Sequence, residues 1–448
     1  MTNAQTSGKL DARDALDAPD ALGTCPPAPR PAGRFDLAIV GAGPVGTTLA
    51  LLLAQRAPHL RVALVDARGP QTGYDDPRTL ALSHGSREIL SRAGAWPHDR
   101  AALEATPIEH IHVSQAQRFG STEIDAREHN VPALGYVVRY GALMRALDNA
   151  TTQLASRVEH LPVDTLPAVL DDGAPGLHHF RGFRAIALRQ DPQQVTITLG
   201  TSGDDHAYTL HAALAVNAEG GLFEGQAARP RARDYGQTAL VGFVQCERPR
   251  IGWAWERFTP DGPLALLPQE NGYALVWCCA HDEAKRRREL DDASFLAELH
   301  KAFGDRMGRF TSIGARAGFP LGLNALGQVV DARVAAIGNA AQTLHPVAGQ
   351  GLNLGLRDAF DLADTLVRDA RTATTPHGVP GPAALRAFAR RRRTDRGITI
   401  RITDALPRVF GIDATPVALL RGMALAGLDL VPPLKTAFAR QMMFGQRG

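Results

Sequence analysis

Two glycine-rich segments contain the residues whose types and spacing could bind a nucleotide cofactor. The first segment is Gly41-Ala-Gly43-Pro44-Val-Gly46, and the next apolar run after it ends at Asp66. Glycines at this spacing permit a tight turn and a close approach of a pyrophosphate to the backbone, and an acid about 20 residues further on can accept hydrogen bonds from a ribose hydroxyl. An acid at Asp66 suits FAD or NAD and disfavours a 2′-phosphate.

The second segment, Gly349-Gln350-Gly351-Leu352-Asn353, opens a helical pattern that continues beyond residue 360. Glycines at the start of a helix let a flat ligand approach backbone N–H groups, and the helix dipole favours partial negative charge there. Pro346 stiffens the loop before it. The three residues 349–351 alone are more typical of an ordinary glycine-rich loop that enters a helix.

The elements that must position these residues can be traced in the hydrophobic pattern. Apolar runs at 35–40 and 61–65 predict buried strands, and the apolar segment 47–54 between them predicts a helix. Strand, glycines, helix, strand and terminal acid in this order indicate a dinucleotide-binding βαβ unit. A third apolar run at 334–337 predicts a strand that ends before the second segment.

The stretch Gly338-Asn339-Ala-Ala-Gln-Thr-Leu-His345-Pro346 resembles a known family motif. It is similar to the second flavin-contacting motif of FAD-dependent aromatic hydroxylases with the p-hydroxybenzoate hydroxylase fold. Within that family it resembles the ubiquinone-biosynthesis branch, and most closely the 2-polyprenyl-6-methoxyphenol hydroxylases. The family usually has Gly-Asp at the first two positions, whereas Asn339 can still form hydrogen bonds but brings no charge.

The resemblance implies further cofactor contacts. Arg78 fits the family's Asp-x-Arg pattern, and Arg139 precedes a helix at a junction that borders the cofactor. The family's Ala-Asp-Gly motif appears here as Ala218-Glu219-Gly220, which keeps the charge but adds a methylene. The expected cofactor residues are therefore Gly41, Gly43, Pro44, Gly46, Asp66, Arg78, Arg139, Glu219, Gly220, Gly338, Asn339, Pro346, Gly349, Gln350, Gly351, Leu352 and Asn353.

The resemblance covers residues 35–445 and implies an α/β fold with two parts. A Rossmann-like FAD-binding domain is expected from 35–105, 127–232 and 324–403, with a substrate domain on a mostly antiparallel sheet from 106–126 and 233–323. Residues 404–448 are expected to be helical. Residues 1–34 have the Ala/Asp/Pro composition of a disordered tail, and 167–183 looks like a loop insertion that contains His178 and His179.

Composition narrows the class of protein. Hydrophobic residues make up 44% of the chain and charged residues 21%, which is ordinary for a globular protein, and the net charge of +3 does not suggest a nucleic-acid partner. The basic runs 285–288 and 390–393 are interpreted as solvated helix faces.

The four cysteines lack metal-ligand spacing and are interpreted as reduced thiols of a cytosolic protein. His110 and His112 could form a metal pair, but solvated histidines are preferred and no metal is expected.

The substrate block and the C-terminal stretch are both apolar. Five large side chains in the block are interpreted as core in preference to substrate contacts: Trp255, Phe258, Leu264, Leu266 and Trp277. The stretch 404–448 has no charge-free window long enough to span a bilayer. It fits either a helix packed on the protein or one that lies on the inner surface of a membrane.

Function follows from the resemblance. It implies a monooxygenase in which NAD(P)H, or an electron-transfer partner, reduces FAD and O₂ then forms a flavin hydroperoxide that hydroxylates a polyprenylated phenol in ubiquinone biosynthesis. No catalytic base stands out, and His345 is only a weak candidate. The alternatives are a same-fold hydroxylase of another ring position or of a soluble phenol, a flavoprotein reductase of isoprenoid lipids, and a non-catalytic scaffold of a quinone-synthesis complex. The sequence leaves open the ring carbon, the prenyl length, the electron donor and the oligomeric state.

Overall fold

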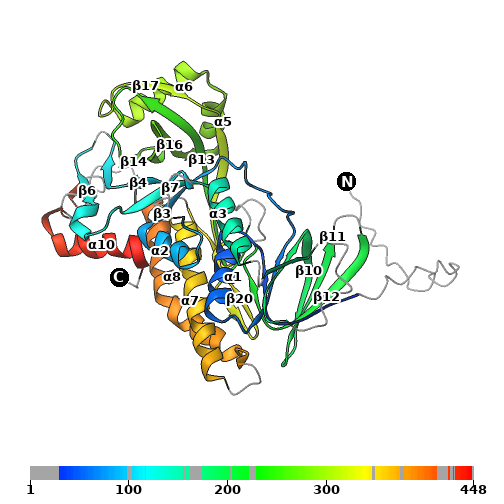
Figure 1. Cartoon of the computed structure of the whole chain (residues 1–448). Helices are drawn as coiled ribbons and strands as arrows, with labels where there is room; N and C mark the ends of the chain where they lie inside the picture. The colour runs from blue at the N-terminus through cyan, green and yellow to red at the C-terminus, as the bar shows by residue number, and fades with distance from the viewer. Residues whose placement is uncertain are drawn as a thin grey trace, which may run out of the picture.

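The computed structural model describes residues 30–97, 103–116, 118–154, 158–161, 174–201, 204–220, 229–345, 349–373, 378–410, 422–423, 427 and 429–445. Figure 1 shows two large sheets, one above the other, with the long helices packed against the lower one. This arrangement confirms the expected α/β class, in which a Rossmann-like domain carries a second domain built on a largely antiparallel sheet.

The first sheet supplies the parallel core of the fold. Its nine strands run in the order β10-β11-β12-β1-β2-β9-β8, with β20 beside β12 and β19 beside β20. Strand β1 pairs in parallel with β2 and β12, whereas β10, β11 and β12 pair antiparallel. The strands are β1 (Arg30–Val40), β2 (Arg61–Asp66), β8 (Val158–Leu161), β9 (Gly176–Arg181), β10 (Phe183–Gln190), β11 (Val195–Thr201), β12 (Asp204–Asn217), β19 (Val330–Asp331) and β20 (Val334–Ala336).

Helices cover one face of this sheet. Leu49 and the four residues after it are fully or almost fully buried, because α1 lies between the sheet and α7 and therefore needs no polar face. Leu356, Leu362 and Leu366 of α7 join the same core cluster. The helices in this layer are α1 (Pro44–Arg56), α2 (His84–Arg92), α3 (Tyr140–Gln153), α7 (Gln350–Thr372) and α8 (Pro382–Phe410), with the short 3-10 turn η5 (Gly338–Ala340) at the start of the second flavin-type motif.

The second sheet forms the upper part of the molecule. Its order is β21-β18-β13-β16-β15-β14-β5-β6, with β17 beside β13, and the one parallel pair on this path is β14 with β5. The strands are β5 (His110–Gln115), β6 (Ser121–Asp125), β13 (Arg231–Cys246), β14 (Trp253–Thr259), β15 (Gly262–Gln269), β16 (Gly272–Ala280), β17 (Phe310–Ile313), β18 (Ala317–Ala325) and β21 (Gln342–Thr343). Helices α5 (His281–Glu289) and α6 (Asp292–Phe303) pack on its outer face, where Trp277, Phe295 and Phe303 form the core.

Smaller elements connect the two sheets. A three-stranded sheet consists of β3 (Thr79–Ser83), β7 (Gly135–Arg139) and β4 (Thr106–Ile108), so β4 does not join the substrate sheet as the sequence suggested. The 3-10 turn η2 (Ala126–His129) follows β6. Helix α10 (Pro432–Phe444) lies against α2 and η2 at the lower left of Figure 1. None of the described helices is long and apolar enough to cross a membrane.

Three expectations need correction. Strand β1 begins at Arg30, five residues before the expected start of order at residue 35, and the tail 1–29 lies outside the described residues. The expected loop 167–183 contains strand β9, which pairs in parallel with β2 and buries both His178 and His179. Helix α8 continues across residue 404, where a separate C-terminal segment was expected to begin.

Candidate active site

One cavity of about 1800 Å³ lies between the two sheets. Its lower part is lined by both glycine-rich segments and its upper part by the second sheet. Among the residues expected to contact a cofactor, those that line it are Gly41, Gly43, Pro44, Asp66, Arg78, Arg139, Glu219, Gly220, Asn339, Gly349, Gln350, Gly351, Leu352 and Asn353. The fold thus brings together segments that are some 300 residues apart in the sequence, as the family arrangement predicted.

The first glycine segment is shaped by backbone contacts. Gly41 has φ +104°, and a Cβ there would lie 2.7 Å from the backbone of Ala218. A Cβ at Gly46 would lie 1.9 Å from the carbonyl oxygen of Gly41. Gly46 does not line the cavity, so its absence of a side chain is required by the packing of α1 against the turn rather than by a ligand.

Asp66 is held at the end of β2 by two donors. One carboxylate oxygen accepts the backbone N–H of Ala42 at 2.6 Å, and the guanidinium of Arg68 binds both oxygens at 2.9 Å. Burial raises the pKa of Asp66, but the bonds from Arg68 and Ala42 outweigh this effect and leave the pKa below its usual value. The carboxylate is therefore charged and oriented before a ribose arrives. Arg68 also lines the cavity and was missed, because an arginine in a turn after a strand carries no specific signal.

Two further arginines reach the cavity. The guanidinium of Arg78 donates to the Asp76 carboxylate at 2.7 Å and lies 4.7 Å from the ring centroid of Tyr140. Arg139 pairs with Glu270 and Glu104. Both expected positions are therefore at the site, and each guanidinium is oriented by a carboxylate.

The sequence departures at Glu219 and Asn339 lie close to each other. A Cβ added to Gly220 would come within 3.2 Å of the Asn339 Cβ, which shows how tightly the two loops approach. Burial raises the pKa of Glu219, and the Asp66 carboxylate raises it further. The carbonyl oxygen of Asn339 accepts a bond from Arg229 at 2.9 Å. Both side chains remain at the cavity wall.

The second glycine segment begins α7 with a left-handed residue. Gly349 has φ +59°, and its carbonyl oxygen accepts a bond from the Asn353 side chain at 2.6 Å. Asn353 also donates to the carbonyl oxygen of Ala81 and accepts the backbone N–H of Ser83, so it fixes the loop to β3. A Cβ at Gly351 would meet nothing within 4 Å, so protein packing does not explain this glycine. The open space above it fits a flat ligand on the amides at the start of α7.

Besides Gly46, the expected residues Gly338 and His345 do not line the cavity. Gly338, with φ +60°, donates its N–H to the Asp358 carboxylate at 3.3 Å. His345 is fully buried against Tyr235 and near Gln237, and burial lowers its pKa to about 4. A neutral ring away from the cavity argues against a catalytic role for His345. Pro346 lies outside the described residues.

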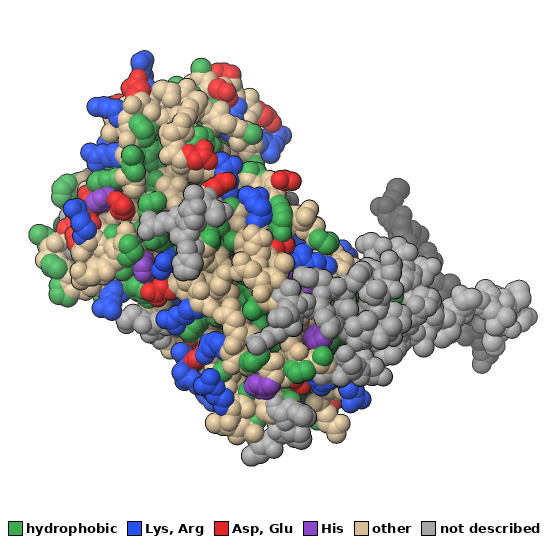
Figure 2. Space-filling model, in the orientation of Figure 1, with side chains coloured by type: hydrophobic (Ala, Val, Ile, Leu, Met, Phe, Trp, Pro, Cys, Tyr) green, Lys and Arg blue, Asp and Glu red, His purple; other side chains and the backbone are tan. Residues whose placement is uncertain are grey.

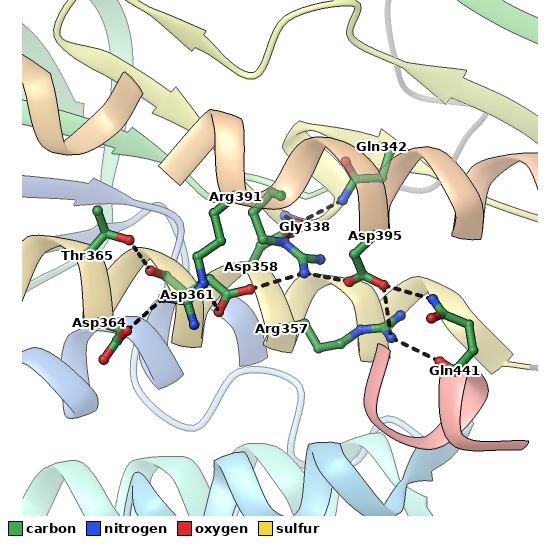
Figure 3. A network of polar contacts seen from close by, with 11 residues as sticks. Gly338, Gln342, Arg357, Asp358, Asp361, Asp364, Thr365, Arg391, Asp395 and Gln441 are labelled. Atoms are coloured by element: carbon green, nitrogen blue, oxygen red, sulfur yellow. Dashed lines mark hydrogen bonds and ion pairs between the residues drawn. The ribbon is translucent and has the colours of Figure 1, made fainter. Parts of the chain in front are cut away.

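A buried ionic network connects α7, which begins with the second segment, to α8 and α10 (Figure 3). The Arg392 guanidinium pairs with Asp358 at 2.8 Å, with Asp361 at 3.1 Å and with Asp395 at 2.5 Å. The Asp395 carboxylate in turn accepts a bond from Gln441 of α10. Arg392 is only 3% exposed, so the run 390–393 is not a purely solvated face as expected. The same correction applies to Arg287 in the run 285–288, which is buried with its guanidinium 3.9 Å from the Trp277 ring centroid.

The upper half of the cavity is lined mainly by apolar side chains. Of the five aromatic and leucine side chains interpreted as core, Leu264, Leu266 and Trp277 lie in the cluster on the outer face of the second sheet, which confirms that interpretation for them. Trp255 belongs to that cluster and also reaches the cavity, and Phe258 lines it. Helix α10 closes the cavity with side chains that the sequence did not assign: Phe438, Ala439, Met442 and Met443.

The two candidate metal ligands, His110 and His112, contact different residues. The His110 ring stacks on Trp253 at 4.6 Å, and its Nδ1 lies 3.4 Å from Glu123 and 3.6 Å from Asp125. His112 instead contacts Arg306 and Trp255. Carboxylates are thus present beside His110, where the sequence suggested none, but the Asp125 carboxylate is paired with Arg127. Both histidines are half-buried rather than solvated.

Comparison with known proteins gives a consistent result. A family model described as an FAD binding domain matches residues 34–376. The chain is 35% identical over 416 residues to ubiquinone hydroxylase UbiL of Rhodospirillum rubrum, which covers 91% of this chain and 89% of that protein. It is 30% identical over 413 residues to 3-demethoxyubiquinol 3-hydroxylase of Escherichia coli, which covers 89% of this chain and 96% of that protein.

The fold is also found in solved structures. The crystal structure of p-nitrophenol 4-monooxygenase PnpA from Pseudomonas putida aligns with a TM-score of 0.67 at 14% identity, and it covers 93% of this chain and all of that chain. The family match spans both glycine-rich segments and the whole second sheet, and the open cradle above Gly351 fits the flavin that such a domain binds. The chain belongs to the FAD binding domain family and is a flavin-dependent monooxygenase.

Proposed function

We propose that this protein hydroxylates the ring of a polyprenylated phenol in ubiquinone biosynthesis, with FAD as cofactor and with NAD(P)H and O₂ as co-substrates. The observation that carries the proposal is the continuous cavity, which joins a polar dinucleotide site to an apolar chamber under the second sheet. A phenol with a long isoprenoid chain needs an apolar chamber of this kind. The names of the two relatives quoted above support the same class of substrate.

The chain's own residues have distinct tasks in this reaction. Bound FAD supplies the redox and oxygen chemistry, which no side chain can perform. Asp66 would bind the adenosine ribose, and the amides at 349–352 would stabilise negative charge on the flavin ring. The apolar sheet face and α10 would exclude water and hold the ring of the substrate. Asn339 would bind the flavin's ribityl chain through its amide, without the charge that the family usually places there.

Turnover with matched phenols tests the proposal. The flavin-loaded protein is given NADH or NADPH with 2-farnesylphenol or with unsubstituted phenol, and the consumption of O₂ and the mass of the product are measured. We expect a product heavier by one oxygen atom from the prenylated compound and much slower turnover of phenol. Turnover of unsubstituted phenol alone would favour the same-fold hydroxylase of a soluble phenol, and a chain that takes up no FAD would favour the scaffold.

We further propose that the protein works at a membrane surface, where a polyprenylated substrate is dissolved. The support is a group of exposed apolar side chains beside α10, here called the apolar rim: Phe119, Met423, Leu430, Val431 and Leu434. Figure 2 shows hydrophobic side chains gathered on this edge of the molecule. Lys435 follows the rim directly and lines the cavity, so the rim borders the chamber that the substrate must enter. Other quinone-synthesis proteins would be partners at the same surface.

A further inference from the structure

On the face of the second sheet, the cavity is lined by a carboxyl side chain that the reaction described above does not use. Along β14, residues alternate between the two faces of the sheet. Ala254, Glu256 and Phe258 line the cavity, and Arg257 reaches the opposite side, where its guanidinium donates to the carbonyl oxygen of Ala302. Trp255 belongs to the core cluster on that opposite side and reaches the cavity only in part. Glu256 therefore projects into the apolar chamber.

The neighbours of Glu256 on the sheet are apolar. In register beside it are Ala265 of β15 and Val113 of β5, which also line the cavity. The Cys278 thiol of β16 interacts electrostatically with Glu256, and burial raises the pKa of this thiol well above its usual value. The Glu256 side chain is half-buried and lines the cavity. No hydrogen bond or ion pair of the Glu256 side chain is found among the described residues.

Cationic side chains at the cavity do not neutralise Glu256. The described arginines and lysine that line the cavity each have a carboxylate of their own: Arg68 with Asp66, Arg78 with Asp76, Arg139 with Glu270, Arg316 with Asp292 and Lys435 with Glu128. A buried carboxyl group without a partner is costly when charged, and burial raises the pKa of Glu256 to about 8. An ionisable group whose pKa burial shifts strongly, and which lines a cavity, is a candidate for a functional group.

We infer that Glu256 is the acid–base group that binds the phenolic hydroxyl of the substrate and removes its proton. The inference deepens the proposed function and rests on it. In the step, the phenol O–H bond breaks, the proton moves to a carboxylate oxygen of Glu256, and the electron pair stays on the phenolic oxygen. The phenolate then has a more electron-rich ring for the oxygen transfer that FAD, NAD(P)H and O₂ supply, and the protonated carboxyl returns the proton to the product.

The total charge of Glu256 and the substrate phenol does not change during the proton transfer, which suits an apolar chamber. One negative charge is present before and after the transfer, so the cavity never has to solvate a second one. An ordinary carboxylate is several pKa units weaker as a base than a phenolate, whereas a carboxyl with a pKa near 8 is within about two units of an unperturbed phenol. A base matched in this way transfers protons efficiently at neutral pH.

Infrared spectroscopy of the flavin-loaded protein tests the inference without turnover. A protonated carboxyl band should be present near pH 6.5 in the wild type, disappear as the pH passes about 8, and be absent in Glu256→Gln. Adding 2-farnesylphenol should shift this band, and adding its methyl ether, which has no proton to give, should not. Equal shifts with both compounds, or no band that Glu256→Gln removes, would overturn the inference; both ligand measurements use the wild type and do not depend on the variant's folding.

The pH profile of turnover gives a second test. In the wild type, kcat/KM for 2-farnesylphenol should rise with pH as Glu256 ionises, and Glu256→Gln should lose this rise together with roughly 10²-fold or more of kcat. Glu247→Gln removes a surface carboxylate that pairs with Arg309 and should keep the wild-type profile. A Glu256→Gln variant with the wild-type profile would refute the role of Glu256 but not the proposed function. A wild type that shows the infrared shift without any turnover would refute the function but leave the binding role intact.

Discussion

At the scale of single residues, the site depends on carboxylates whose surroundings set their charge. Asp66 is charged because Ala42 and Arg68 donate to it, whereas burial raises the pKa of Glu256, for which the described residues include no such donor. The same functional group thus serves as a fixed acceptor for a ribose at one end of the cavity and as a proton-exchanging group at the other. Burial raises the pKa of both carboxyl groups, and only the hydrogen-bond donors around Asp66 bring its pKa back below the usual value.

Replacing Asp66 by asparagine should weaken FAD binding by roughly ten- to a hundred-fold, since hydrogen bonds to a charged acceptor contribute about 1.5–3 kcal/mol. The measurement is a fluorescence titration of the flavin-free protein with FAD. Asp291→Asn is the matched control, because that carboxylate also accepts a backbone N–H, from Ser294, but does not line the cavity. Equal losses in both variants would mean that Asp66 acts through folding rather than through the ribose.

Glu256 should also leave a signature in the pH dependence of stability. Its folded pKa is raised from 4.5 to about 8, so the stabilising contribution of the protonated form is fully present below pH 4.5 and is lost as the pH rises through about 8. Between these limits the melting temperature of Glu256→Gln should therefore rise relative to the wild type. Glu247→Gln should show no such rise in this window, because the backbone N–H of Arg309 lowers the pKa of Glu247 and its contribution to stability changes only below pH 4.5. A wild type and Glu256→Gln with parallel profiles would contradict the raised pKa.

At the scale of elements, a buried ionic network holds α7, α8 and α10 together. Arg392 of α8 is paired with two carboxylates of α7 and with Asp395 of its own helix. Replacing Arg392 by methionine should lower the free energy of unfolding by about 3–5 kcal/mol, because it leaves uncompensated buried carboxylates. The unfolding of flavin-loaded protein in urea measures this.

A control variant at a surface arginine distinguishes the effect of losing a buried ion pair from the effect of losing a positive charge. Arg286 also contacts two carboxylates, those of Glu283 and Glu298, but all three side chains are substantially exposed. Arg286→Met should lower the free energy of unfolding far less than Arg392→Met does, because solvent screens exposed ion pairs. If both variants lower the free energy of unfolding equally, the burial of the ion pairs around Arg392 does not make them more important for stability.

The elements also show how far the sequence could be interpreted. Strands β1, β2 and β20 and helices α1 and α7 were predictable, because glycine spacing and apolar runs follow from local steric and burial requirements. Strand β9 was not, because its Gly-Leu-His-His-Phe pattern is polar in the middle and only its position between β2 and β8 buries it. Glu256 could be assigned to a strand, but which face of that strand meets the cavity is decided by the packing of the whole second sheet.

At the scale of the whole molecule, the cofactor site, the apolar chamber and the apolar rim follow one another in space. If the rim contacts a membrane, replacing Leu430 and Leu434 by glutamate should reduce cosedimentation with vesicles of phosphatidylcholine and phosphatidylglycerol by at least about tenfold, since burying a leucine contributes about 1.5–3 kcal/mol. The same double change at Ile186 and Leu188 of β10, also exposed but distant in Figure 1, should have little effect. Vesicle binding that is unchanged by both double variants would argue against a membrane role for the rim.

Helix α10 is synthesised after both glycine-rich segments, so its part of the cavity wall is the last to form. The residues of both glycine-rich segments precede position 354, whereas the cavity wall formed by Phe438, Met442 and Met443 comes from the last described helix. Domains can begin to fold from the N-terminal side while the chain is still being made. A nascent chain can therefore assemble its dinucleotide site while the chamber is still open on the α10 side, and a bulky cofactor has an entry route that closes only once residues 432–444 have left the ribosome.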